Sequence, residues 1–158
     1  MEKFDNKTFL EVWDRVTEKP KPIKSGEQSD REKLCFFMDR AAFCIAFYTA
    51  LAQKSRRENA EIFRKLALSV KEDMRELMSA YFVLTGDTYT PERVKPYFSS
   101  VLDGVRDMYL AEKAEKEAYH RSAMETENGS LTDLCHRLAS MCEKRADKLM
   151  EIIKKALR

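Results

Sequence analysis

Apolar side chains recur every three or four positions along most of the chain, the spacing that places them on one face of an α-helix. Gly and Pro interrupt this pattern at only a few places. The uninterrupted intervals predict an all-α protein with four long helices. We expect these helices at residues 29–55, 58–84, 99–124 and 130–158.

Residues that favour helix ends support these boundaries. Ser29 precedes Glu32 by three positions, a capping box that marks the start of the first long helix. Gly86 is a typical left-handed cap for the end of the second. Residues 87–98, "DTYTPERVKPYF", contain two prolines and cannot continue a helix, so we expect a crossover here with one helical turn of its own.

The residues before the first long helix form a separate segment. Phe9, Trp13 and Val16 share one helical face and predict a short amphipathic helix, followed by a polar stretch that contains proline. We therefore divide the chain into residues 1–28, a short N-terminal helix and linker, and residues 29–158, a helical bundle. A short helix gains stability mainly by packing on its own bundle or on a second copy, which favours a homo-oligomer such as a dimer.

The lengths of the links predict how the helices are arranged. Short links join the first helix to the second and the third to the fourth, whereas a longer link joins the second to the third. This is the pattern of a four-helix bundle made of two helical hairpins with one crossover. The segment "FRKLALSVKEDMREL" at 63–77 also aligns with "CHRLASMCEKRADKL" at 135–149, which indicates two copies of one hairpin.

The faces predicted to form the core are apolar except near the middle of three helices, where charged residues interrupt them. The interruptions are Asp73, Glu112 with Glu115, and Arg145. The other predicted core positions are Leu34, Phe37, Ala41, Cys44, Tyr48, Leu51, Phe63, Leu66, Val70, Leu77, Leu84, Val105, Met108, Tyr119, Cys135, Leu138, Cys142, Leu149 and Ile152.

The two-fold alignment brings the charged interruptions to equivalent places. Asp73 of the second helix corresponds to Arg145 of the fourth. We expect six aligned positions to surround one place at the centre of the bundle, and these are Ala41, Val70, Asp73, Glu112, Cys142 and Arg145.

Composition and charge narrow the class of protein. The 158 residues suit one domain, and 29 Lys and Arg nearly balance 27 Asp and Glu, so no strong field favours nucleic acid or an anionic membrane. The longest weakly polar run, residues 41–52, is shorter than the roughly 18 to 20 residues that span a bilayer. The start of the chain lacks the features of a secretory signal, and the spacing of the four cysteines matches neither a zinc site nor a redox pair. We therefore expect a soluble, cytoplasmic protein with reduced cysteines.

The segments "FRKLALSVKEDMRELMSAYFVLTG" and "VRDMYLAEKAEKEAYHRSAM" resemble the rubrerythrin-type branch of the ferritin-like family, and the likeness covers roughly residues 9–157. The resemblance implies a ferritin-like bundle that holds two iron ions, with one Glu from each of two helices and a Glu-x-x-His pair from each of the other two. Only Glu112 keeps the residue type of this motif. Carried over to this chain, the Glu positions are Ala41, Val70, Glu112 and Cys142, and the His positions are Asp73 and Arg145.

The departures from the motif favour a protein without the usual metal site. Ala and Val donate no ligand atoms and Arg is a cation, so we predict no cofactor and no catalytic residues. Asp73 and Glu112 still bring negative charge into the interior, where an unpaired charge is costly. The planar guanidinium of Arg145 can bond one carboxylate on each side, and we hypothesise that it replaces the metal as a structural counter-ion. The chain is then a non-catalytic structural or binding module.

A second interpretation stays open at this stage. The chain would be a metal-dependent oxidoreductase acting on oxygen or peroxide, with iron or manganese in an altered mono- or dinuclear site around Glu112. Its candidate ligands are Asp73, Glu112 and Cys142, with Glu115 or Glu143 as a further ligand. From the sequence we place Glu115 at the solvated rim of the bundle.

The histidines do not add to this site. One literal Glu-x-x-His occurs, Glu117 to His120, but neither residue shares a helical face with Glu112. We interpret this pair and His136 as surface residues, and we find no Ser-His or Cys-His arrangement suited to nucleophilic catalysis.

Overall fold

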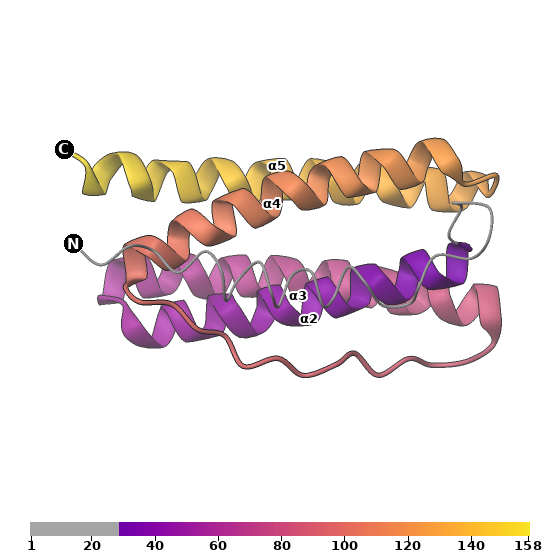
Figure 1. The fold of residues 1–158 in the computed structure, drawn as a ribbon, viewed down its shortest axis with the longest axis horizontal. Coiled ribbons are helices and arrows are strands. Elements are labelled where there is room, and N and C mark those ends of the chain that lie inside the picture. The colour runs from indigo at the N-terminus through magenta and orange to yellow at the C-terminus, as the bar shows by residue number, and fades with distance from the viewer. Residues whose placement is uncertain (1–28) are drawn as a thin grey trace.

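The computed structural model describes residues 29–158, and all regular secondary structure in this part of the chain is helical (Figure 1). The helices are α2 (Asp30–Lys54), α3 (Arg57–Thr85), α4 (Val101–Glu125) and α5 (Gly129–Ala156). The prediction of an all-α four-helix bundle is confirmed, and each predicted helix boundary lies within two residues of the observed one. The short N-terminal helix predicted within residues 1–28 lies outside the described residues.

The helices form two antiparallel hairpins that pack against each other (Figure 1). One hairpin is α2 with α3 and the other is α4 with α5, and the hairpins meet where α2 faces α4 and α3 faces α5. The link from α3 to α4 runs back along the bundle, so these two helices point in the same direction (Figure 1).

The crossover contains no helical turn, so that part of the prediction is wrong. The reason is its reach: α3 has 29 residues and is about 44 Å long at the rise of an α-helix. The short crossover covers such a distance only with a nearly extended backbone. Asp39 of α2 holds it in place, because the Tyr89 hydroxyl donates to both carboxylate oxygens at 2.9 Å and the Glu92 backbone N–H donates to Oδ1 at 3.1 Å.

Side-chain and backbone caps close the helix ends. Ser29, Ser100 and Asn128 precede α2, α4 and α5, and each side chain accepts a hydrogen bond from a backbone N–H of the first turn. Gly86 ends α3 with φ of 74°, and its N–H donates to the carbonyl of Phe82 at 2.8 Å. This is the left-handed cap that the sequence predicts.

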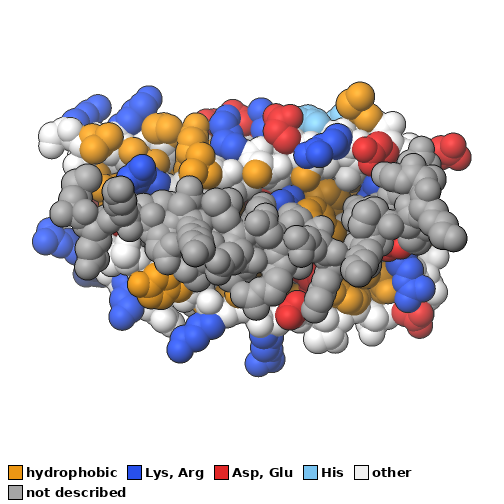
Figure 2. All heavy atoms as spheres, viewed as in Figure 1, with side chains coloured by type: hydrophobic (Ala, Val, Ile, Leu, Met, Phe, Trp, Pro, Cys, Tyr) orange, Lys and Arg blue, Asp and Glu red, His pale blue; other side chains and the backbone are white. Residues whose placement is uncertain are grey.

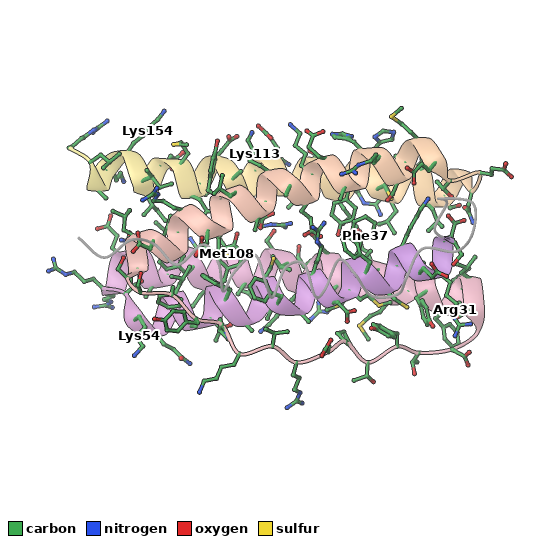
Figure 3. All side chains as sticks on the ribbon, in the orientation of Figure 1. Arg31, Phe37, Lys54, Met108, Lys113 and Lys154 are labelled. Atoms are coloured by element: carbon green, nitrogen blue, oxygen red, sulfur yellow. The ribbon has the colours of Figure 1, made fainter. Side chains whose placement is uncertain are left out.

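The core lies between the two hairpins, where Phe37 of α2 and Met108 of α4 point toward each other's hairpin (Figure 3). Every predicted core position is buried except Leu84, which is 40% exposed. Leu84 lies three heptads after Phe63, and an α-helix rotates by about 20° per heptad relative to a seven-residue repeat. Tyr81, which is 3% exposed, packs into the core in its place.

Helix α2 is long and apolar enough to span a membrane by length and composition. Most of its apolar stretch is buried inside the bundle. The expectation that no stretch reaches this length was wrong, since it counted only residues 41–52 and stopped at the charged Asp39 and Arg40. A core helix of a bundle passes the same test, so this property does not by itself place α2 in a membrane.

Candidate functional site

The candidate site is a polar cluster at the centre of the bundle, built around Arg145 of α5. This side chain is 4% exposed. Its Nε lies 2.8 Å from Oε1 of Glu112 on α4, and its Nη1 lies 2.8 Å from Oδ2 of Asp73 on α3. The expected pairing of Arg145 with one carboxylate on each side is therefore confirmed. One guanidinium joins three helices.

Three further groups complete this cluster. The Tyr48 hydroxyl of α2 donates to Oε1 of Glu112 at 2.7 Å, so all four helices contribute a side chain. Nη1 of Arg145 also donates to the Ser69 hydroxyl at 2.9 Å, and Nη2 approaches the sulfur of Cys142 at 3.5 Å. Buried polar groups that are hydrogen-bonded in this way avoid the cost of desolvation without a partner.

Charges in this cluster shift one another's proton affinity. Burial raises the pKa of Asp73 to about 6, although the nearby Arg145 acts in the opposite direction. Burial alone would lower the pKa of Arg145, but Glu112 and Asp73 raise it well above its ordinary value. The guanidinium is therefore a permanent cation in the bundle centre.

A second buried ion pair lies beside the first and was not expected. Arg40 of α2 and Glu115 of α4 are 4% and 5% exposed, and Nε of Arg40 lies 3.8 Å from Oε2 of Glu115. The Arg40 guanidinium also stacks over the Phe36 ring, 4.2 Å from its centroid. The prediction that Glu115 lies at the solvated rim is wrong, because Glu115 faces Arg40 across the interface between α2 and α4.

Glu115 is the group in this second pair whose protonation is most affected by its surroundings. Burial raises the pKa of its carboxyl to about 7, against the opposing effect of Arg40 and with a further increase from Glu112. Burial lowers the pKa of Arg40, while the charge of Glu115 raises it. The two pairs therefore form one coupled set of buried charges.

The remaining predicted positions supply no complete ligand set. Ala41 and Val70 are buried apolar residues, 4% and 3% exposed, with no donor atom in their side chains. Cys142 is fully buried, and burial raises the pKa of its thiol far above the ordinary value, which disfavours the thiolate that a metal binds. Glu143 lies away from the centre, where it pairs with Lys113 at 3.3 Å and Lys116 at 2.8 Å.

The histidines lie at the periphery, as the sequence predicts. His136 and Glu117 are exposed and His120 is half-buried. The two imidazole rings are neighbours, with centroids 5.7 Å apart. None of these three residues makes a recorded contact with the Arg145 cluster, so the literal Glu-x-x-His is not part of the candidate site.

These donors do not fit a di-iron centre of the ferritin-like kind. Within residues 29–158, no group of three or more His, Cys, Asp or Glu side chains is arranged so that it could hold a metal ion. The guanidinium of Arg145 is hydrogen-bonded to the two carboxylates that such a centre would need. A second cation there would be repelled by the first.

Two further buried polar residues, Arg40 and Asp107, were not predicted from the sequence. Arg40 has a signal, because it shares a helical face with Phe36, Phe43 and Phe47 at spacings of four, three and four. Asp107 is 2% exposed, and its Oδ1 has no hydrogen-bond partner among residues 29–158. Burial, with a smaller effect of the nearby Asp103, raises its pKa to about 8.

No protein-family model, curated protein or solved structure matches this chain. The function must therefore be argued from the geometry of the bundle and of its polar centre.

Proposed function

We propose that the chain is a ferritin-like, rubrerythrin-related module in which an arginine has replaced the metal centre, and that it acts as a non-catalytic structural or binding protein. The observation that carries this proposal is the position of Arg145, which bonds both Asp73 and Glu112 at 2.8 Å in the bundle centre. In a metal-binding member of the ferritin-like family, histidines would stand at positions 73 and 145 and a glutamate at position 112.

The arrangement of the helices supports the ferritin-like part of the proposal. Two hairpins joined by a long crossover are the connectivity of that class of bundle. The centre is formed by residues at equivalent places of the two hairpins, since Asp73 on α3 and Arg145 on α5 occupy aligned positions. A fold alone does not determine a function, so the proposal depends mainly on the chemistry of the bundle centre.

The chemistry of the centre supports the non-catalytic part. A redox-active metal needs several oxygen or nitrogen donors with positions left open for a substrate. Here one guanidinium is bonded to the two carboxylates, and the thiol of Cys142 is buried and protonated. The proposal includes a cytoplasmic location and self-association as a homo-oligomer.

Metal analysis of anaerobically purified protein tests the proposal. We expect iron and manganese far below one ion per chain, and no change of metal content in Glu112→Gln. The competing function, an oxidoreductase with an altered metal site, predicts about one or two ions per chain that are lost in Glu112→Gln. That second result would overturn the proposal.

A further inference from the structure

A groove open to solvent lies between α3 and α5, with a volume of about 410 Å³ and mostly apolar walls. Half-buried Met141 of α5 supplies apolar surface, and Leu66 of α3, which is 5% exposed, adds only a narrow edge. Lys65, Lys144 and Lys148 line the same groove from exposed positions. Pockets of this size, apolar with a few charged groups, are typical sites for small molecules.

Positive charge exceeds negative charge around the groove. Asp147 is the one acidic residue among its described lining residues, against three lysines. Lys148 pairs with Glu151 at 3.6 Å. Lys65 and Lys144 take part in no ion pair within the described residues. Within residues 29–158, no acidic side chain therefore competes with an anion for these two ammonium groups.

The polar centre does not compete for this anion. Arg145 and Ser69 also line the groove, but the guanidinium charge is matched by Asp73 and Glu112 at 2.8 Å each. The groove and the buried cluster are thus adjacent sites with separate charges. An anion in the groove would be held by the lysines.

The surroundings of the groove add to its positive potential. Lys65 lies near the start of α3 and Lys148 near the end of α5, and these helix ends meet at one end of the bundle (left in Figure 1). Figure 2 draws the face on which α2 and α4 lie in front, and basic side chains also predominate at this end of that face. The exposed basic residues there are Lys54, Arg56, Arg57, Lys154 and Lys155, and the exposed acidic residues Glu58 and Glu151 offset part of their charge. Such a field attracts anions over several ångströms of solvent.

We propose that this groove binds a single-chain anionic amphiphile of the fatty-carboxylate type. The carboxylate lies between Lys65 and Lys144, and the hydrocarbon chain covers Leu66 and Met141. The apolar walls contribute to binding by removing hydrocarbon from water, and the lysines select the anionic head. This inference goes beyond the proposed function and holds whether or not the centre of the bundle binds a metal.

Calorimetric titration with decanoate, below its micelle concentration, tests the site. We expect saturable binding of about one decanoate per chain, weakened by about tenfold or more in Lys65→Glu/Lys144→Glu because the head loses both cations. Arg93→Glu is the matched control: Arg93 is exposed on the crossover, does not line the groove and is not one of the basic residues at the end of the bundle, so the affinity of this variant should equal that of the wild type. Circular dichroism checks that all variants fold.

Decanol, butanoate and phosphatidylserine vesicles are the three comparison ligands. Decanol, which keeps the chain and lacks the charge, and butanoate, which keeps the charge and lacks the chain, should each bind about tenfold more weakly or worse. The proposal is overturned by absence of saturable decanoate binding, by equal binding of decanoate and decanol, or by unchanged affinity in the double variant. It is also overturned if phosphatidylserine vesicles bind through these lysines while decanoate does not.

Discussion

At the scale of single residues, Arg145 enters the interior together with the two carboxylates that it bonds. Taking a charge out of water costs several kcal/mol, and short, direct hydrogen bonds to opposite charges offset much of that cost. The distances of 2.8 Å to Asp73 and Glu112 meet this requirement. Removal of one member would leave the others buried without compensation.

Arg145→Ala should therefore lower the free energy of unfolding by about 3 to 5 kcal/mol, the usual effect of removing one partner of a buried pair. Urea denaturation followed by circular dichroism measures it. Arg137→Ala is the control, because Arg137 pairs with Glu76 on the surface at 57% and 43% exposure. That change should cost about 1 kcal/mol or less. Equal, small effects of both substitutions would show that Arg145 does not stabilise the centre.

Glu115 makes a prediction about pH. Folding raises the pKa of its carboxyl from 4.5 to about 7, so the folded protein binds this proton more tightly than the unfolded chain. Its contribution to the free energy of unfolding is then largest below pH 4.5 and decreases as the pH rises to about 7. Above that pH the contribution is constant.

Glu115→Gln removes this dependence, because Gln remains neutral. The free energy of unfolding of the variant minus that of the wild type should increase by about 3 kcal/mol from about pH 4 to about pH 8. Denaturation curves across this range measure the difference. Glu117→Gln, at an exposed position of the same helix, should give a flat difference. A flat difference for Glu115→Gln as well would contradict the raised pKa.

The predictable part of the site is the part that periodicity reveals. Asp73, Glu112 and Arg145 interrupt apolar helix faces, and a charge on a buried face requires an opposite charge nearby. Arg40 was missed because it lies on the neighbouring face of its helix, beside Ala41 rather than in line with it. Glu115 was wrongly placed at the rim because its buried partner, Arg40, was not recognised.

At the scale of elements, helix ends were predictable and tertiary contacts of the crossover were not. Ser29 and Gly86 act through local backbone geometry, which a short stretch of sequence encodes. Asp39 holds Tyr89 and Glu92, which lie 50 and 53 residues away in the chain. No local pattern identifies such partners, and the extended form of the crossover follows from the distance between the helix ends.

Gly104 lies at a close approach of α4 to α2. A Cβ at this position would lie 2.8 Å from Cδ2 of Leu51 and 3.2 to 3.3 Å from the rings of Phe98 and Phe47. Leu51 is fully buried and has little room to move. The glycine therefore allows the two hairpins to meet here.

Gly104→Ala should lower the free energy of unfolding by about 1 to 3 kcal/mol through overpacking, although alanine favours a helix interior by about 1 kcal/mol. Gly129→Ala on α5 is the matched control, since a Cβ there meets nothing within 4 Å. Thermal denaturation of both variants measures the effects. If the Gly104→Ala protein is as stable as the Gly129→Ala protein, α2 and α4 accommodate the added methyl group without loss of stability, and the prediction is wrong.

At the scale of the whole molecule, the internal alignment explains why the two hairpins have complementary centres. Asp73 of α3 and Arg145 of α5 occupy aligned positions in the sequence, and the packing of the hairpins brings these opposite charges to 2.8 Å from each other. The four-helix arrangement and its crossover could be predicted because link lengths limit the topology. The way in which chains associate could not be predicted, because the hydrophobic pattern of one chain does not specify which surface a second copy would contact.

The central claim is that the Arg145 guanidinium takes the place of a metal ion. It is tested most directly by titrating Mn²⁺ into the wild-type chain and into Cys142→Glu/Arg145→His, which restores a Glu-x-x-His pair on α5 facing Asp73 and Glu112. With bound Mn²⁺ measured by equilibrium dialysis, the account predicts about one ion per chain for the variant and no stoichiometric binding for the wild type. The same binding by the two proteins, whether both take up the ion or neither does, would contradict it.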